Sequence, residues 1–258
     1  ITPAQYFNSA DELGAYAINY YTSLIATNDA AYNAGPLNVD GDTDNMVVGE
    51  ANTNYFAPDR WLVPSSGGPS FSVIRAMNYF LEQVLPKKEA GAISGSTEDI
   101  NHYIGEIYFL RAMAYFNQLR TYGDFPIITV VPEDKTDQLV ELSKRAPRNE
   151  VARFILGDLD KAISMLRPGS AFNKVRIGKE IALLVKSRVA LYEASFERYH
   201  KGTPRVPGAA GWPGAGMAYN AGKSFNIDSE VDFFLTEAMS AAKEVADNHN
   251  LTQNTQVL

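Results

Sequence analysis

Apolar side chains recur every three to four residues along most of this chain, which is the period of one face of an α-helix. The segment 97–122 carries two apolar stripes, so more than half of its circumference must pack against other elements, and we expect it to be the central helix. The six segments with this pattern predict helices over about residues 10–27, 70–85, 97–122, 147–167, 179–199 and 229–245.

Residues with known preferences for helix ends support these bounds. Ser9 is followed three residues later by Glu12, which is a capping pattern that begins a helix. Ser96 opens a similar pattern at the start of the central helix. Pro86 and Gly123 are expected to end the second and third helices, because proline lacks a backbone N–H and glycine tolerates a positive φ.

The order of these elements predicts the fold class. Only residues 126–131 have the β-branched character of a strand, and that stretch is short. Consecutive helices joined as antiparallel pairs indicate an all-α, tetratricopeptide-like α-solenoid of helix pairs, with long irregular loops and little or no β-structure. The chain has no clean 34-residue self-similarity, so any repeat is structural.

Two connections, residues 28–69 and 200–227, are much longer than the packing of helices requires. Loops of more than about 12 to 15 residues in a compact protein are usually functional or disordered. Both connections contain aromatic residues, which favours an ordered surface, so we look for function there.

Composition limits the possible partners. The formal net charge of -7 gives no electrostatic reason to bind nucleic acid, and neutral or cationic ligands are the easier partners. The chain has no cysteine, so thiolate chemistry and cysteine-ligated metals are excluded. No apolar run approaches the ~18 residues of a membrane span, and the residues from Ile1 onward do not have the pattern of a signal peptide.

Four parts of the chain resemble the SusD/RagB family. The most specific stretch reads GEIYFLRAMAYF over residues 105–116 and LRTYGDFPI over residues 119–127. The other matching segments agree in order and spacing, so the resemblance covers essentially the whole chain; they are residues 147–159, residues 182–192, and Trp61 with residues 74–78.

This resemblance implies a helical scaffold on the outer face of a Gram-negative outer membrane, held by an amino-terminal lipid anchor. Such a protein would cover a SusC-like TonB-dependent transporter and capture glycan, or peptide in some members. Family members run about twice this length and carry a lipobox cysteine. We therefore expect residues 1–258 to form one domain that makes up the amino-terminal half of a longer protein, with no cofactor and no enzymatic activity.

Glycan capture requires flat aromatic surfaces for stacking and polar side chains for sugar hydroxyls. Trp212, between Gly211 and Pro213, is expected to be exposed, whereas Trp61 has an alternative place in the core under the second helix. The side chains with suitable chemistry on the two long connections are the candidate ligand-binding residues: Trp212, Asp42, Asn45, Tyr55, Phe56 and Trp61.

Two arginines are expected to be structural. Arg111 lies among apolar residues of the central helix, and a buried guanidinium needs an anionic partner, so we expect an internal pair with Glu106, Asp158 or Asp160. Arg188, inside the fifth helix, is interpreted in the same way.

Three alternatives remain open at this point. Asp40, Asp42 and Asp44 alternate like the start of a calcium-binding loop, but Asn45 stands where that loop needs glycine. Two carboxylates could converge as in a glycosidase, which needs no sequence motif. The scaffold could also be a protein-interaction solenoid whose concave face binds a helix or a peptide.

Overall fold

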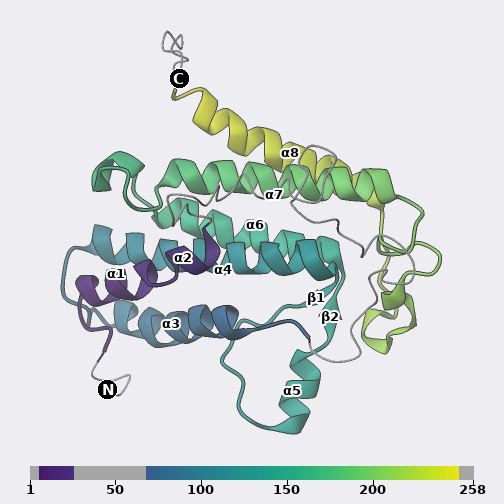
Figure 1. Cartoon of the computed structure of the whole chain (residues 1–258), viewed down its shortest axis with the longest axis horizontal. Helices are drawn as coiled ribbons and strands as arrows, with labels where there is room; N and C mark the ends of the chain where they lie inside the picture. The colour runs from purple at the N-terminus through teal and green to yellow at the C-terminus, as the bar shows by residue number, and fades with distance from the viewer. Residues whose placement is uncertain (1–5, 26–67, 250–258) are drawn as a thin grey trace, which may run out of the picture.

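The computed structural model describes residues 6–25 and 68–249. Its longest helix, α4, lies at the centre of the molecule, as expected (Figure 1). The helices are α1 (Ala10–Ile18), α2 (Tyr21–Leu24), α3 (Ser72–Glu89), α4 (Thr97–Tyr122), α5 (Thr136–Leu142), α6 (Arg148–Met165), α7 (Lys179–His200) and α8 (Ile227–Ala246). The strands are β1 (Phe125–Pro126) and β2 (Arg145–Ala146), and the short 3-10 helices are η4 (Gly169–Phe172), η5 (Pro213–Gly216) and η6 (Ala218–Asn220).

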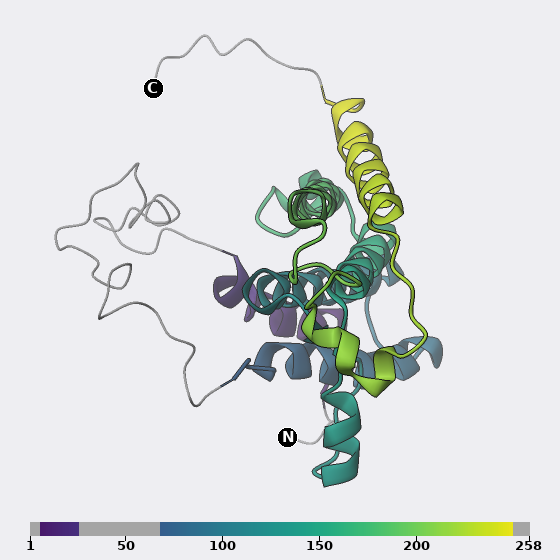
Figure 2. The same cartoon turned by 90° about the vertical axis from the view of Figure 1, so that its right-hand side faces the viewer.

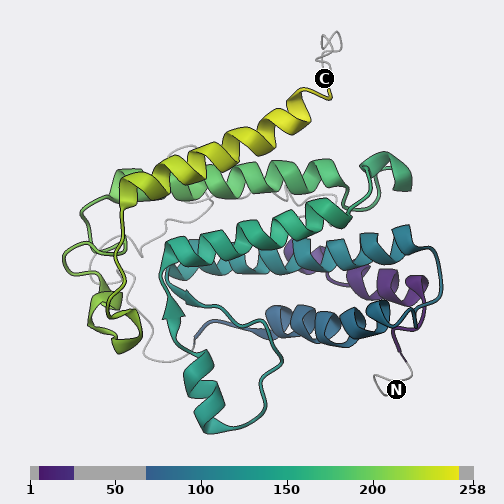
Figure 3. The ribbon, with the colours of Figure 1, turned by 180° about the vertical axis from the view of Figure 1, so that it is seen from behind.

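The long helices stack side by side in the order α3, α4, α6, α7 and α8, while α1 and α2 pack against α4 (Figures 1 and 3). The view turned by 90° places α8 at the outer end of the stack (Figure 2). Each helix of the stack begins near the end of the helix before it, so neighbours are antiparallel. The all-α prediction of paired helices is confirmed for the described residues.

The first helix is shorter than its apolar pattern predicts. Ser9 caps it as expected, but the helix ends at Ile18 and a separate turn, α2, follows. The change of direction lets the Tyr21 hydroxyl donate to Glu106 Oε1 at 2.6 Å and accept the backbone N–H of Ile177 at 3.1 Å. These are tertiary contacts, which the local pattern does not contain.

The predicted end of the second helix at Pro86 is wrong, because α3 continues through this proline to Glu89. The ring falls in the last turn, where the helix is ending and the cost of one missing N–H is small. The predicted start of α4 is confirmed: Ser96 Oγ accepts the backbone N–H of Asp99 at 3.0 Å.

The stretch 126–131, predicted as a strand, pairs with β2 only at Pro126, next to Phe125. Beyond Pro126, side chains and not a neighbouring strand form hydrogen bonds with the backbone. Ile128 exchanges two hydrogen bonds with the Tyr115 hydroxyl, and its carbonyl also accepts from Asn78 Nδ2 at 2.8 Å. Because these groups satisfy the backbone, no further strand pairing is needed.

Arg111 makes the internal pair expected from the sequence, and Asp158 is the partner. Its Nε and Nη2 donate to the two carboxylate oxygens at 2.6 and 2.8 Å, and its Nη1 donates to Asn78 Oδ1 at 2.9 Å. One guanidinium therefore joins α3, α4 and α6 inside the core. The matching interpretation of Arg188 is wrong, because its side chain lies on the exposed face of α7.

The connection between α7 and α8 is ordered, as its aromatic content indicates. It is a series of tight turns with positive φ at Gly208, Gly211 and Gly222, and it includes η5 and η6. Asn220 Nδ2 donates to the carbonyl of Gly214 at 3.0 Å, which holds these two short helices together. The connection packs at the end of the stack where α4 ends and α6 begins (Figure 1).

Candidate functional site

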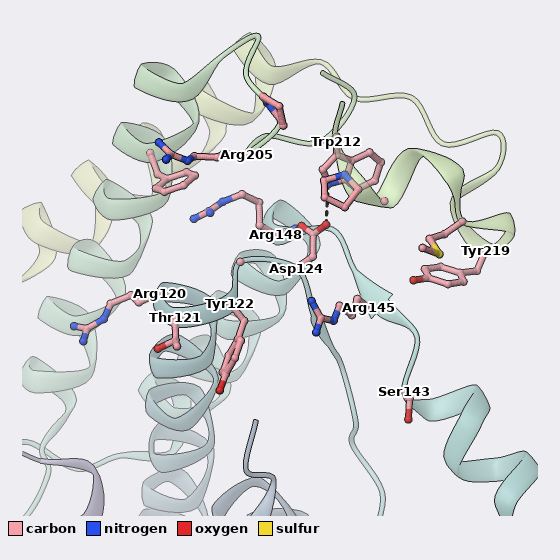
Figure 4. Close-up of a pocket in the computed structure, with 16 residues that line it drawn as sticks. Arg120, Thr121, Tyr122, Asp124, Ser143, Arg145, Arg148, Arg205, Trp212 and Tyr219 are labelled. Carbon is pink, nitrogen blue, oxygen red and sulfur yellow. Dashed lines mark hydrogen bonds between the residues drawn. The ribbon is translucent and has the colours of Figure 1, made fainter. Parts of the chain in front are cut away.

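A pocket of about 580 Å³ opens at this end of the stack (Figure 4). It lies between the last turn of α4, the segment that leads into α6, the end of α7 and the connection that follows α7. The residues that line it are Arg120, Thr121, Tyr122, Gly123, Asp124, Ser143, Arg145, Arg148, Phe196, Pro204, Arg205, Trp212, Pro213, Gly214, Met217 and Tyr219.

Asp124 fixes the relative positions of the parts that form the pocket. Gly123, at φ +71°, turns the chain out of α4 and leads into Asp124. One carboxylate oxygen of Asp124 accepts the backbone N–H of Arg148 at 2.9 Å, at the start of α6. The other accepts the indole N–H of Trp212 at 2.7 Å (Figure 4). The carboxylate therefore links α4, α6 and the connection after α7.

Burial raises the pKa of the Asp124 carboxyl, while the hydrogen bond from Trp212 and the charges of Arg148 and Arg145 lower it. Burial is the larger effect, so the net pKa lies above its usual range. The hydrogen bonds from Trp212 and from the backbone N–H of Arg148, together with the two arginine charges, favour the ionised form of Asp124.

The positive charge of Arg148 is neutralised inside the protein. Its Nε and Nη2 donate to the two oxygens of Glu193 at 2.7 and 2.8 Å, and both side chains are buried. The guanidinium carbon also lies 3.3 Å from the ring centroid of Phe196. This arrangement positions the Phe196 ring as part of the pocket wall and leaves Arg148 little capacity to bind a ligand anion.

Trp212 lines the pocket, but the expectation that its indole is exposed is wrong, because only 5% of the residue is accessible. The ring packs edge-on against Phe225 at 5.2 Å between centroids and covers Gly214, where a Cβ atom would lie 2.2 Å from the ring. Because its N–H donates to Asp124 and its ring is buried, Trp212 is a structural part of the pocket wall. A contact between the indole and a ligand stays a prediction.

The other candidate ligand residues, namely Asp42, Asn45, Tyr55, Phe56 and Trp61, lie outside the described residues, as do Asp40 and Asp44 of the calcium hypothesis. The structure therefore does not bring them together with Trp212 or separate them from it. Within residues 6–25 and 68–249, no group of three or more histidine, aspartate or glutamate side chains is arranged to hold a metal ion.

Exposed side chains at the rim of the pocket were not singled out by sequence reasoning. Tyr122 and Tyr219 are 41% and 36% accessible, and they provide aromatic surface that a ligand can reach. Arg120, Arg145 and Arg205 are exposed as well, and within the described part of the chain none of them forms an ion pair. These five residues come from three segments, namely α4, β2 and the connection after α7, and only the fold brings these segments together.

One sequence signal could have pointed to this end of α4. Arg120, Tyr122 and Asp124 all fall in the most specific stretch of the family resemblance. The position of Asp124 beside Trp212, 88 residues away in the chain, depends on the tertiary structure.

Among the described residues, the pocket does not contain the carboxylate pair that a glycosidase uses. Asp124 is the single acidic residue among the described residues that line it, whereas such enzymes place two carboxyl groups on either side of the scissile bond. Among the described helices, none combines the length and the apolar character needed to cross a bilayer.

A stack of antiparallel helices with an open pocket at one end defines an all-helical scaffold of the solenoid class. The chain belongs to the SusD-like family: the family model described as "Starch-binding associating with outer membrane" matches residues 7–191. This match confirms the resemblance seen in the sequence.

Curated relatives from Formosa agariphila match part of the chain. SusD-like protein P2 is 25% identical over 149 residues, which are 58% of this chain and 28% of that protein. SusD-like protein P38 is 29% identical over 98 residues, or 37% of this chain and 18% of that protein. The chain thus spans less than a third of the length of these relatives.

Among solved structures, a SusD homolog from Bacteroides thetaiotaomicron has the same fold. It aligns with a TM-score of 0.52 at 16% identity, over 97% of this chain and 43% of that one. A SusD-like protein from Bacteroides fragilis is 32% identical over 50% of this chain and 23% of its own, with a TM-score of 0.40. The fold prediction is confirmed by the first of these, and the expectation of one domain in the amino-terminal half of a longer protein stays a prediction.

Proposed function

We propose that this chain captures oligosaccharides in the pocket at the end of α4, as a non-enzymatic binding protein for nutrient uptake. The observation that carries the proposal is the combination, in one preformed concavity, of the accessible tyrosines Tyr122 and Tyr219 with hydrogen-bonding side chains. Aromatic faces stack on the C–H faces of sugar rings, and arginine and carboxylate groups bind hydroxyls. The description of the family as starch-binding supports the same ligand class.

The rigidity of the pocket supports binding by a preformed site. Asp124, Trp212 and Arg148 are tied together by buried hydrogen bonds, so the rim side chains stand on a fixed base. A preformed site loses less conformational entropy when a ligand binds. This raises the affinity, which matters most for weakly binding ligands such as sugars.

Isothermal titration calorimetry with a panel of oligosaccharides tests the proposal. Tyr122→Ala and Tyr219→Ala should each weaken binding roughly three- to tenfold, the value of one aromatic stacking contact. Tyr199→Ala is the matched control, because Tyr199 is 82% accessible and does not line the pocket. Binding that depends equally on all three tyrosines, or on none, would place the sugar site elsewhere.

Peptide capture is the alternative, and the same panel distinguishes it when short peptides are included. Saturable binding of peptides, together with no binding of any sugar, would replace glycan capture by a peptide receptor or a protein-interaction solenoid. The calorimetric signal needs no assumption about which side chain contacts the ligand.

We also propose that the protein acts at the cell surface, held in the outer membrane by an amino-terminal lipid anchor, and passes its ligand to a SusC-like TonB-dependent transporter. The family description, which associates its members with the outer membrane, supports this placement. Digestion of intact cells with a protease should remove the protein if it is surface-exposed. Protection of the protein in intact cells, with loss only after lysis, would contradict the placement.

A further inference from the structure

The described residues that line the pocket carry a charge opposite in sign to the net charge of the chain. The whole chain carries a formal net charge of -7, which by itself disfavours acidic ligands. The residues that line the pocket, however, include four arginines and one acidic residue, Asp124. A concave surface with low-dielectric walls concentrates the field of such a cluster, so a local excess of positive charge can attract an anion to an acidic protein.

Three of the four guanidinium groups are available to a ligand. Arg148 is committed to Glu193, so its charge is neutralised. Arg120, Arg145 and Arg205 are exposed and have no ion-pair partner in the described part of the chain. They come from α4, from β2 and from the connection after α7, and the close-up draws them at separate places around the pocket, with their guanidinium groups pointing in different directions (Figure 4).

The one acidic group offers little opposition to a ligand anion. Burial raises the pKa of Asp124, and each of its oxygens already accepts a hydrogen bond from the protein. The guanidinium group is planar and presents paired N–H donors that match the two oxygens of a carboxylate or of a sulfate ester. Tyr122 and Tyr219, beside these arginines, provide stacking surface for the ring that carries the anion.

We infer that this pocket selects oligosaccharides that carry anionic groups, carboxylates or sulfate esters, and that Arg120, Arg145 and Arg205, at separate points of the rim, bind these groups. The inference rests on the proposed function, because it names the class of glycan that the same pocket takes. It reverses the expectation from the net charge, since the ligand meets the local field of the rim and not the average charge of the chain.

Calorimetric titration with matched sugars tests the inference. Galacturonate trisaccharide is compared with its methyl ester, and a sulfated galactan oligosaccharide with its desulfated form, so that each pair shares its sugar rings and linkages and differs at the anionic substituent. The anionic member of one pair should bind at least about tenfold more tightly, the value of one or two charge-assisted hydrogen bonds. This preference should shrink as the salt concentration rises, because the arginines are exposed.

Substitutions assign the preference to the rim. Arg120→Gln, Arg145→Gln and Arg205→Gln should each reduce the affinity for the anionic sugar, and the double variant of Arg145 and Arg205 should abolish the preference. The three side chains are exposed and form no ion pair with a described residue, so these variants should fold normally. Arg188→Gln is the matched control, because Arg188 is an exposed arginine of α7 that does not line the pocket.

Each result decides one of the two proposals. If neutral and anionic sugars bind equally, and the arginine variants bind like the parent protein, anion selection is wrong while glycan capture stands. If no sugar binds, glycan capture fails and the inference fails with it. If a hexaglutamate peptide binds as tightly as the acidic sugars, the rim is a general anion site and the assignment to glycans is overturned. Which pair shows the preference, uronate or sulfate, identifies the anionic group.

Discussion

Gly105 lies where α4 crosses α6 closely. A Cβ atom at this position would lie 3.1 Å from Met165 Cβ and 3.3 Å from the carbonyl oxygen of Ala162, and neither atom can move without a shift of α6. Gly157, within α6, has no atom within 4 Å of the same hypothetical Cβ. Two glycines in neighbouring helices are therefore in opposite situations, one required by packing and the other not.

We expect Gly157→Ala to raise the free energy of unfolding by about 0.5 to 1 kcal/mol, because alanine favours the helix. Gly105→Ala gains the same propensity but loses about 1 to 3 kcal/mol to overpacking, so it should be the less stable variant of the two. Urea unfolding followed by circular dichroism gives both values. Equal free energies of unfolding for the two variants would show that α6 can shift to accept a Cβ at position 105 without loss of stability.

At the scale of elements, the helices are held together by a few buried charged groups as well as by apolar packing. Arg111 of α4 contacts Asp158 of α6 and Asn78 of α3, and Asn78 Nδ2 in turn donates to the carbonyls of Ile128 and Val130. Both members of the ion pair are almost inaccessible. The loss of one partner would leave an unpaired buried charge, which is the costly situation.

Asp158→Asn should therefore lower the free energy of unfolding by about 3 to 5 kcal/mol. Asp247→Asn, the same change in the exposed pair with Lys243 on α8, should alter it by less than about 1 kcal/mol. Chemical unfolding of the two variants is the measurement. A cost for Asp158→Asn as small as that for the surface pair would mean that water reaches Arg111.

At the scale of the whole molecule, the junction of α6, α7 and α8 contains a carboxyl group that is unfavourable when ionised. Glu197 of α7 is fully buried, and no N–H or O–H group of the described residues donates a hydrogen bond to its oxygens. Burial, with the charges of Glu193 and Glu230, raises the pKa of Glu197 to about 9, against the opposing charge of Arg148. Glu197 is therefore protonated in the folded protein near neutral pH.

The sign of the pH dependence follows from this raised pKa. The folded protein holds a proton that the unfolded chain releases near pH 4.5, so the stabilisation from protonated Glu197 is fully present below that pH. It is lost progressively as the pH rises toward about 9, where the buried group ionises in the folded state as well.

Glu197→Gln should remove the loss of stability with rising pH, because the amide stays neutral at every pH. The stability of the variant relative to the parent should increase between pH 5 and pH 9, by at most about 1.4 kcal/mol per pH unit, the limit for one proton. Urea unfolding at several pH values measures the difference. Glu82→Gln, an exposed position of α3, serves as the control, and its difference from the parent should not change with pH in this way. A constant difference for both variants would show that Glu197 is ionised in the folded state.

The local sequence predicted most helices but not the details that depend on neighbours. Ser96 and Gly123 set the bounds of α4 because their effects act within one turn of the chain. The break after α1 and the short β1 have a different cause. They follow from hydrogen bonds of Tyr21 to Glu106 and of Tyr115 to Ile128, between residues that the pattern does not connect.

The sequence by itself determined the all-α class, the position of the central helix, the family and the need of Arg111 for an internal anion, because periodicity, capping and burial of charge are local or pairwise properties. Only the tertiary structure decided that Trp212 is buried against Asp124, that Arg188 faces solvent, and that the pocket carries an excess of arginine. These outcomes depend on which distant segments share the end of the stack. The electrostatic field and the solvent exposure at a site depend on all the residues that surround it in space. Neither the order of residues nor the net charge of the chain gives this information.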